Sequence, residues 1–258
     1  FFANITHELK TPLTLILAPT ESILKGEMGT FGGEQQEIFH RIYRNGLRLM
    51  KLISDLLDLA KLEDSKLRLR LEEVDLADFL NELVGNIQPL ADRKEIDLTY
   101  EVRGEDTGIW SDQNRLEQIL INLLSNAVKF TGEGGRVRVI CDATGQQLHV
   151  SVEDSGIGIP QDKLRMIFDR FSQVDGSSTR KYGGTGIGLA LAKELVNLHE
   201  GELFAESEVG KGTTMHVLFR RGRSHFRDDV VDRRTQRQPI PAGRRSDDGG
   251  LPEWWAQL

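Results

Sequence analysis

A histidine, a carboxylate and a hydroxyl lie within one short stretch near the start of the chain, and their chemistry stands out first. Glu8 directly follows His7, and Thr11 comes four residues after the histidine. A neutral imidazole is nucleophilic near neutral pH without a strong base. We therefore interpret His7 as a candidate nucleophile, to which the rest of the chain would deliver an electrophile. The alternative is an ordinary histidine on the surface of a helix.

Composition narrows the class of protein. Of the 258 residues, 38% are apolar and 28% are charged, which is typical of a soluble globular protein with one large domain or two modest ones. The net charge of -7 argues against a nucleic-acid-binding protein, because neutralising phosphates requires a basic surface. The single cysteine, Cys141, excludes an intrachain disulfide and is expected to be buried filler.

No stretch of the sequence approaches 18 consecutive apolar residues, so we predict no membrane-spanning segment. No signal peptide is recognisable either. The chain begins with Phe1 inside a pattern that predicts a helix, and we expect it to be a fragment of a longer protein.

Two long helices are predicted to present His7. Apolar residues recur at helical spacings over residues 1–26, and a sustained heptad pattern covers 34–64, with Ile42, Leu49 and Leu56 seven residues apart. Joined by a short Gly-rich loop, these helices would form an antiparallel hairpin. A second copy would cover the apolar stripe in a dimeric four-helix bundle. Alternatively, the stripe packs on the downstream domain. Pro12 is expected to kink the first helix just past His7.

The following part of the chain mixes strands and helices, which predicts an α/β (α+β) sandwich. We expect strands over 67–74, 96–102, 136–141, 148–152, 202–206 and 213–219. Helices are expected over 76–92, from a cap at Ser111 or Asp112 to Phe130, over 161–170 and over 185–199, with a loop rich in Gly, Ser and charged residues over 172–183. Residues 222–258, rich in Arg, Asp and Pro, are interpreted as a linker or tail, in which Trp254 and Trp255 are unexplained.

One helix carries three polar side chains in a row. Asn122, Asn126 and Lys129 lie at i, i+4 and i+7, on one face of the helix that is predicted to end at Phe130. Two carboxamides and an ammonium in this pattern can bind a metal ion and phosphate oxygens together. The ordinary alternative is the polar outer face of an amphipathic helix.

A carboxylate and two glycines follow a predicted strand. In Asp154-Ser155-Gly156-Ile157-Gly158, the carboxylate can accept a hydrogen bond from an exocyclic amine. The glycines would let the backbone approach a flat ring closely. An ordinary Gly-rich turn explains the same pattern.

A third segment opens a predicted helix with glycines, in the run Gly183-Gly184-Thr185-Gly186-Ile187-Gly188-Leu189. Unpaired backbone N–H groups at a helix start form an anion site that suits phosphates. The spacing matches neither the Rossmann nor the P-loop pattern. A weaker segment, Gly210-Lys211-Gly212-Thr213-Thr214, precedes the last strand.

In this order and with these strand and helix positions, the segments resemble the conserved boxes of bacterial sensor histidine kinases of two-component systems, over residues 1 to about 221. The run His7-Glu8-Leu9-Lys10-Thr11-Pro12 resembles the H box, and Asn122 to Lys129 the N box. Asp154 to Gly158 resembles the G1 box, Phe168-Asp169-Arg170-Phe171 the F box and Gly184 to Gly188 the G2 box. The resemblance implies a dimerisation and phosphotransfer hairpin over 1–65, a Bergerat-type ATP-binding domain over 66–221 and a tail over 222–258.

The resemblance also implies a role for each matching residue. His7 would accept the phosphoryl group, Glu8 would fix its tautomer and Thr11 would position a water for dephosphorylating a partner. The implied nucleotide site holds Mg²⁺ at Asn122, phosphate or metal-bound oxygens at Asn126 and Lys129, and the adenine amine at Asp154 with Thr213 nearby. Arg170 would approach the terminal phosphate. Thr185, Leu189 and the glycines of the G1 and G2 boxes would surround the ligand. These glycines are Gly156, Gly158, Gly184, Gly186 and Gly188.

The implied activity is autophosphorylation of His7 from Mg²⁺-ATP and transfer to an aspartate on a response-regulator receiver domain, with dephosphorylation of that regulator as a second activity. We expect a homodimer and a cytoplasmic location, with any membrane attachment in upstream segments and a receiver domain as one continuation of the tail. A catalytically silent nucleotide-binding scaffold is the alternative. A simple ATPase is disfavoured, because related ATPases carry a water-activating Glu at the position of Asn122.

Overall fold

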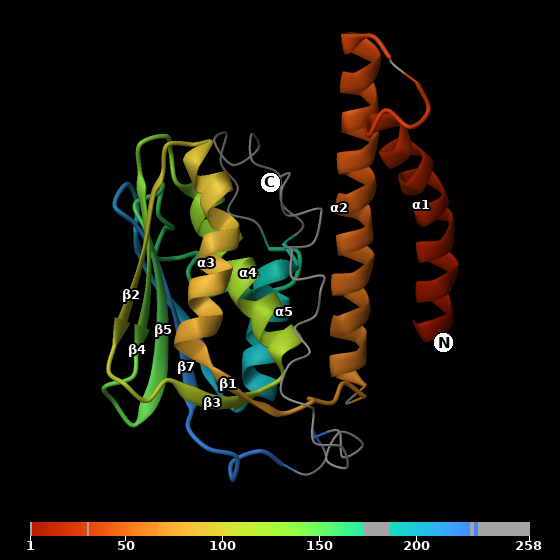
Figure 1. The fold of residues 1–258 in the computed structure, drawn as a ribbon. Helices are drawn as coiled ribbons and strands as arrows, with labels where there is room; N and C mark the ends of the chain where they lie inside the picture. The colour runs from red at the N-terminus through yellow and green to blue at the C-terminus, as the bar shows by residue number, and fades with distance from the viewer. Residues whose placement is uncertain (1, 30, 65, 173–185, 228–229, 232–258) are drawn as a thin grey trace. The chain divides into compact units, whose positions relative to one another are not determined.

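A computed structural model describes residues 2–29, 31–64, 66–172, 186–227 and 230–231. The side chains of residues 2–8 and 10 lie outside this description, as do residues 173–185 and 232–258. The chain divides into a helical unit within Phe1–Lys66 and a larger α/β unit that begins at Leu67. Figure 1 shows both units, and each is described separately below. The predicted class of fold, a helical region followed by an α/β domain, is confirmed.

The helical unit is a hairpin of α1, Phe2–Leu24, and α2, Gly33–Glu63. Its core is a cluster in which Leu13 and Leu17 pack with Tyr43 and Leu47. The two helices approach closely at Gly46, where a Cβ atom would lie 2.6 Å from Cδ2 of Leu17. The hairpin is therefore held together by small and large apolar side chains from both helices.

The heptad stripe of α2 stays on the surface of the hairpin. The side chains of Ile42, Leu49 and Leu56 are 42%, 48% and 50% exposed. Together with Ile16 and Ile38 on the same unit, the first two line an apolar groove. α1 continues as one helix through Pro12, and the kink expected there stays a prediction.

The α/β unit is built on a five-stranded sheet with the strand order β2-β4-β5-β7-β6. β2 and β4 run parallel, whereas all other neighbours run antiparallel. The strands are β2 Asp97–Arg103, β4 Arg136–Asp142, β5 Gln147–Asp154, β6 Glu202–Glu208 and β7 Gly212–Arg220. The ends of β5 and β7 thereby bring Asp154 directly opposite Thr213.

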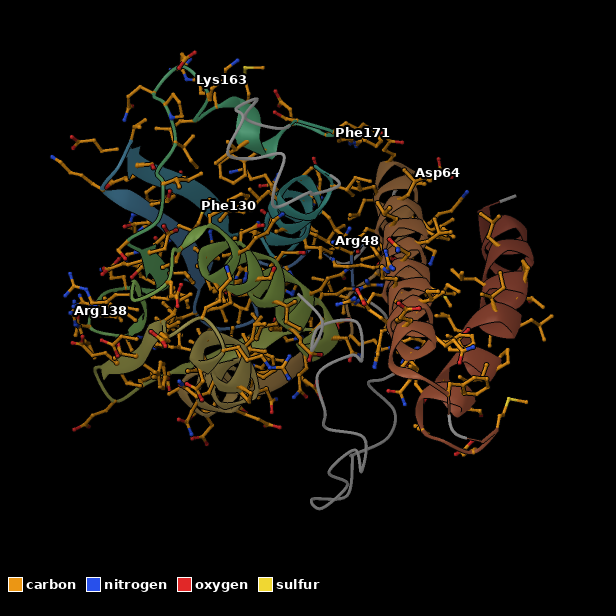
Figure 2. All side chains as sticks on the ribbon, turned by 90° about the horizontal axis from the view of Figure 1, so that it is seen from above. Arg48, Asp64, Phe130, Arg138, Lys163 and Phe171 are labelled. Atoms are coloured by element: carbon orange, nitrogen blue, oxygen red, sulfur yellow. The ribbon has the colours of Figure 1, made fainter. Side chains whose placement is uncertain are left out.

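Three helices cover one face of this sheet: α3 Leu76–Asp92, α4 Gln113–Phe130 and α5 Gly188–Leu198 (Figure 1). Figure 2 labels Phe130, the last residue of α4. Asp112 caps the start of α4, since its Oδ1 accepts from the backbone N–H of Arg115 at 3.2 Å. Fully buried apolar residues of α4 and the strands form the core between the two layers, including Leu116, Ile119, Leu120, Leu124, Val137, Val139, Leu148 and Val150.

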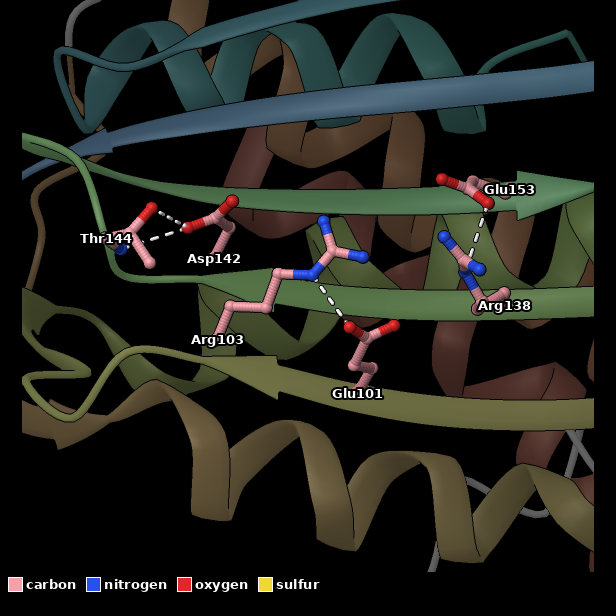
Figure 3. Close-up of polar contacts among 6 residues, drawn as sticks. All are labelled: Glu101, Arg103, Arg138, Asp142, Thr144 and Glu153. Atoms are coloured by element: carbon pink, nitrogen blue, oxygen red, sulfur yellow. Dashed lines mark hydrogen bonds and ion pairs between the residues drawn. The ribbon is translucent and has the colours of Figure 1, made fainter.

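The opposite face of the sheet is polar where β2, β4 and β5 meet (Figure 3). Arg138 Nε lies 3.2 Å from Glu153 Oε2 across β4 and β5, and Arg103 Nε donates to Glu101 Oε1 at 2.7 Å. The hydroxyl and backbone N–H of Thr144 both donate to Asp142. Exposed ion pairs of this kind contribute little to stability, because water screens them, and this face of the sheet is exposed to solvent.

Three local features differ from the sequence-based expectations. The helix expected over 161–170 is one short 3₁₀ turn, Met166–Phe168, because Ile167 alone in that segment is buried and no apolar stripe holds a longer helix. The strand expected over 67–74 is limited to β1, Glu72–Asp75. It pairs antiparallel with β3, Gly108–Ser111, a short strand that was not predicted.

The residues just after the last strand pack against the α/β unit. Val230 and Val231 are each 6% exposed. The backbone N–H of Leu69 donates to Val230 O at 2.7 Å, and Leu69 forms an isolated parallel bridge with Val231. The guanidinium of Arg223 lies 5.1 Å from the ring centroid of Trp110. The described residues of the predicted tail therefore pack on the α/β unit through Val230 and Val231. The surrounding Arg and Asp residues gave no indication of this contact.

Candidate functional site

The three polar residues predicted to share a face of α4 do so in the second half of that helix. Asn122 is buried, whereas Asn126 and Lys129 are half-buried. A Cβ atom on Gly188, the first residue of α5, would lie 2.8 Å from Asn122 Oδ1. The structure therefore brings the carboxamide of Asn122 against the start of α5, where unpaired backbone N–H groups favour anions.

Asp154 ends β5 and is held by backbone donors from two directions. Its Oδ1 accepts from Gly156 N at 2.8 Å and from Thr213 N at 3.3 Å. Burial raises the pKa of the Asp154 carboxyl from 3.8 to about 6, although both backbone donors oppose this shift. Among the described residues, no group donates to Asp154 Oδ2. This half-buried carboxylate is therefore oriented by the described residues through Oδ1 alone.

The loop after β5 is pressed against the end of α4. A Cβ atom on Gly156 would lie 2.6 Å from Phe130 O and 2.7 Å from Asp154 Oδ1. Gly158 has a φ of 68°, and its Cβ would lie 2.1 Å from Glu208 O. Glycine is needed at both positions, because any side chain would displace either the carboxylate or the backbone beside it.

Ser207 joins this loop to the turn before β7, a connection that the sequence did not reveal. Its hydroxyl accepts from Ile159 N at 2.8 Å and donates to Gly212 O at 2.8 Å. The hydroxyl oxygen of Thr213 lies 2.9 Å from the hydroxyl oxygen of Ser207, and the two residues are opposite each other in the β6–β7 pair. The sequence gives no signal for this contact, because Ser207 lies just beyond the strand expected over 202–206 and the pairing of that strand was not predicted.

The glycine-rich segment before α5 is described only at its end. Gly186 has a φ of 67°, and its O accepts from Phe171 N at 2.9 Å. Figure 2 labels Phe171, whose side chain is 65% exposed. Leu189 is half-buried in the first turn of α5, and Arg170 is exposed. Gly184, Thr185 and most of the loop expected over 172–183 lie outside the described residues.

The predicted phosphoacceptor group lies on α1. His7, Glu8 and Thr11 are all helical, so Thr11 follows the histidine by about one turn. Thr11 is exposed, whereas the side chains of the other two residues lie outside the described ones. Within the described ranges, no group of three or more His, Cys, Asp or Glu side chains could hold a metal ion. None of the described helices combines the length and apolar character needed to cross a membrane.

Comparisons with known proteins agree with this arrangement. The family model "His Kinase A (phospho-acceptor) domain" matches residues 1–65, and the model "Histidine kinase-, DNA gyrase B-, and HSP90-like ATPase" matches residues 111–223. The two matches occur in the order expected for a kinase core. The two matches together identify the chain as a histidine kinase catalytic core, whose α/β unit has the Bergerat ATP-binding fold.

Individual relatives are histidine kinases. The chain is 39% identical over 219 residues to the circadian input-output histidine kinase CikA of Synechococcus elongatus, covering 84% of this chain and 29% of that protein. It is 35% identical over 221 residues to the sensor histidine kinase WalK of Bacillus subtilis, covering 83% of this chain and 35% of that protein. The chain thus spans about a third of the length of these relatives.

Among solved structures, full-length ShkA in complex with AMPPNP matches with a TM-score of 0.71 at 31% identity, covering 84% of this chain and 45% of that chain. The histidine kinase ThkA in complex with the response regulator TrrA has the same fold, with a TM-score of 0.59 at 22% identity over 85% of this chain and 60% of that chain.

Proposed function

We propose that this chain binds ATP in the α/β unit and transfers its terminal phosphoryl group to His7. The observation that carries the proposal is the state of Asp154. Asp154 is a half-buried carboxylate whose Oδ1 accepts from two backbone N–H groups and whose Oδ2 has no donor among the described residues, which is costly unless a ligand supplies one. The exocyclic amine of adenine is such a donor, and Gly156 keeps the approach to Asp154 free of side chains.

The residues of α4 and α5 suit the phosphates and a magnesium ion. The amide oxygen of Asn122 is the type of hard ligand that Mg²⁺ accepts, and it lies against the start of α5 at Gly188. Asn126 and Lys129 would bind metal-bound or phosphate oxygens, and Arg170 the terminal phosphate. Bound Mg²⁺ would supply charge neutralisation.

In the proposed reaction, a ring nitrogen of His7 attacks the γ-phosphorus of ATP. The new N–P bond forms as the bond from phosphorus to the β–γ bridging oxygen breaks, and ADP leaves. Glu8 would accept a hydrogen bond from the other ring N–H and stabilise the developing positive charge. An amide at Asn122, instead of a carboxylate able to activate water, favours transfer to a side chain over hydrolysis.

We also propose that phosphorylated His7 donates its phosphoryl group to an aspartate on the receiver domain of a response regulator. Thr11 would position a water molecule that dephosphorylates the same regulator. The similarity in fold to ThkA, whose structure contains a response regulator, supports this class of partner. We place the kinase core in the cytoplasm, where ATP and such regulators are available.

The occupant proposed for the exposed stripe of the hairpin is a second copy of the chain. Ile42, Leu49 and Leu56 repeat every seven residues and are about half exposed, as expected for one half of a coiled-coil-like bundle. Two hairpins would cover both stripes in a four-helix bundle. Analytical ultracentrifugation tests this, since Leu49→Asp should convert a dimer into monomers.

Nucleotide selectivity tests the site. ATP should bind at least about tenfold more tightly than GTP, because GTP presents a carbonyl oxygen to Asp154 where ATP presents an amine. Equal affinities would contradict the role of Asp154. A scaffold that only binds nucleotide would show the same selectivity but would never carry phosphate on His7.

The role of Thr11 is tested separately. Thr11→Ala should slow dephosphorylation of a purified regulator without slowing autophosphorylation of His7.

A further inference from the structure

The last four carbonyl groups of α4 are all hydrogen-bonded, by three different segments. Ala127 O accepts from the N–H and the hydroxyl of Thr131, at 3.0 and 2.7 Å. Phe130 O accepts from Ile157 N at 3.4 Å. Between them, the ammonium of Lys94 donates to the carbonyls of residues 128 and 129, at 2.8 and 3.0 Å. Such carbonyls have no partner within a helix, so each bond is supplied from outside.

Lys94 reaches α4 from a tight connection between α3 and β2. Its own backbone N–H donates to Ala91 O at 3.0 Å, and Glu95 after it has a φ of 55°. The side chain is half-buried, and burial lowers its pKa. A cation at this end of a helix is favoured by the helix dipole. The bonds span 34 and 35 residues of sequence, so they connect parts of the domain that local structure does not link.

The turn that Lys94 holds carries a proposed phosphate ligand. Lys129 belongs to it, and its ammonium lies 4.8 Å from the ring centroid of Phe130. The same turn borders the loop after Asp154, through Phe130 O and Gly156. A shift of this turn would therefore move Lys129 relative to the carboxylate proposed to bind adenine.

We propose that Lys94 is a positioning residue for ATP binding, which acts by fixing the last turn of α4 and hence the placement of Lys129. The proposal rests on the function proposed above. In this proposal Lys94 acts through α4 and does not itself bind the nucleotide. It makes the orientation of Lys129 a property of the α3–β2 connection rather than of α4 alone.

Lys193 provides a matched control within the same unit. Its Nζ donates to Leu203 O at 2.5 Å, joining α5 to β6, and its side chain is also half-buried. Replacing either lysine with Met removes a lysine-to-carbonyl contact and preserves the length of the stem. A purely structural role predicts that Lys94→Met and Lys193→Met lower the melting temperature without distinguishing between them in nucleotide affinity.

Titration of the full chain with a fluorescent ATP analogue and Mg²⁺, at least 15 °C below each melting temperature, tests the proposal. We expect Lys94→Met to raise the Kd for the analogue about tenfold, because small misplacements of a binding group weaken its contacts. The Kd of Lys94→Arg should be close to that of the wild type. The Kd of Lys193→Met should differ from the wild-type value by less than about twofold. If Lys94→Met does not fold, Lys94→Gln is used instead, because it keeps an N–H donor on a shorter side chain. Its Kd should lie between those expected for the wild type and for Lys94→Met.

A double-mutant cycle with Lys129→Ala separates indirect from independent action. If Lys94 acts through Lys129, the double variant should bind no more weakly than Lys129→Ala alone. Fully additive losses, or equal losses in Lys94→Met and Lys193→Met, would overturn the proposal. Failure of the wild-type chain to bind the analogue at all would instead contradict the proposed function.

Discussion

The backbone N–H of Thr213 donates to Oδ1 of Asp154 at 3.3 Å, from the residue directly opposite it in the antiparallel β5–β7 pair. The N–H of Gly156 donates to the same oxygen. Backbone groups of a sheet and of the loop that follows it therefore set the direction of this carboxylate. Oδ2 has no donor among the described residues, which is consistent with the ligand-binding role that we propose for Asp154.

Asp154→Asn should stabilise the apoprotein at pH 8. The folded pKa of about 6 exceeds the ordinary 3.8, so ionisation opposes folding as pH rises through 6. We expect a gain of about 1–3 kcal/mol at pH 8 that shrinks toward pH 4, with nucleotide binding lost. Denaturant unfolding at both pH values measures it. Asp142→Asn is the control, because hydrogen bonds from Thr144 lower the pKa of Asp142 and its loss should destabilise at pH 8. A destabilised Asp154→Asn would contradict the account.

His199 should make the domain sensitive to acid. Its Nδ1–H donates to Leu195 O at 2.7 Å, its Nε2 accepts from Asp112 N at 3.4 Å, and burial lowers its pKa below 6.5. His199 therefore binds a proton more readily in the unfolded chain than in the folded one. The stability of the wild type consequently falls as the pH drops through 6.5.

His199→Ala removes this titration together with its packing. We expect the variant to be less stable by about 2–4 kcal/mol at pH 7.5, and the difference from wild type to shrink at pH 5.5. Denaturant unfolding at the two pH values provides the comparison. A difference that grows on acidification would show that His199 is not held neutral in the fold.

Glu95→Gly should stabilise the α/β unit. Glu95 is exposed and has a φ of 55°, a conformation that costs non-glycine residues about 1–2 kcal/mol. Part of the gain is lost because glycine is more flexible when unfolded, leaving about 0.5–1 kcal/mol. Glu95→Ala keeps the Cβ atom and should bring no gain. Equal effects of both substitutions on the melting temperature would point to charge rather than strain.

Val231→Ala should destabilise the α/β unit, because this side chain is buried beside the Leu69 bridge. The expected loss is about 1–2 kcal/mol. Val209→Ala, at a position 62% exposed, is the matched control and should change stability by less than about 0.5 kcal/mol. Similar small effects at both positions would show that the segment after Arg220 contributes nothing to the fold.

Strong periodicity is what made the fold predictable. The helices α1 to α4 follow from apolar residues at helical spacing, and the central strands from alternation. The pattern failed at 161–170, where Ile167 is the only buried residue, and at β3, whose four residues are too few to show alternation. Both are cases in which tertiary contacts, not local pattern, decide the structure.

The candidate site was predictable where it is carried by short motifs. Glycines at 156 and 158 signalled a close backbone approach, and the structure shows what they approach, Phe130 O and Glu208 O. Ser207 and Lys94 carried no such signal, because a single side chain bonded to a distant backbone atom leaves no pattern in the sequence. Supporting residues of this kind are recognised only in the three-dimensional structure.

Phosphorylation of His7 is the most direct test of the central claim. The purified chain is incubated with γ-labelled ATP and Mg²⁺, and the label is followed on the protein and by peptide mapping. We predict an acid-labile, alkali-stable label on His7 that is absent from His7→Gln, while both proteins bind ATP equally. Binding of ATP without any label on the wild type, or equal labelling of His7→Gln, would contradict the assignment of His7 as the phosphoacceptor.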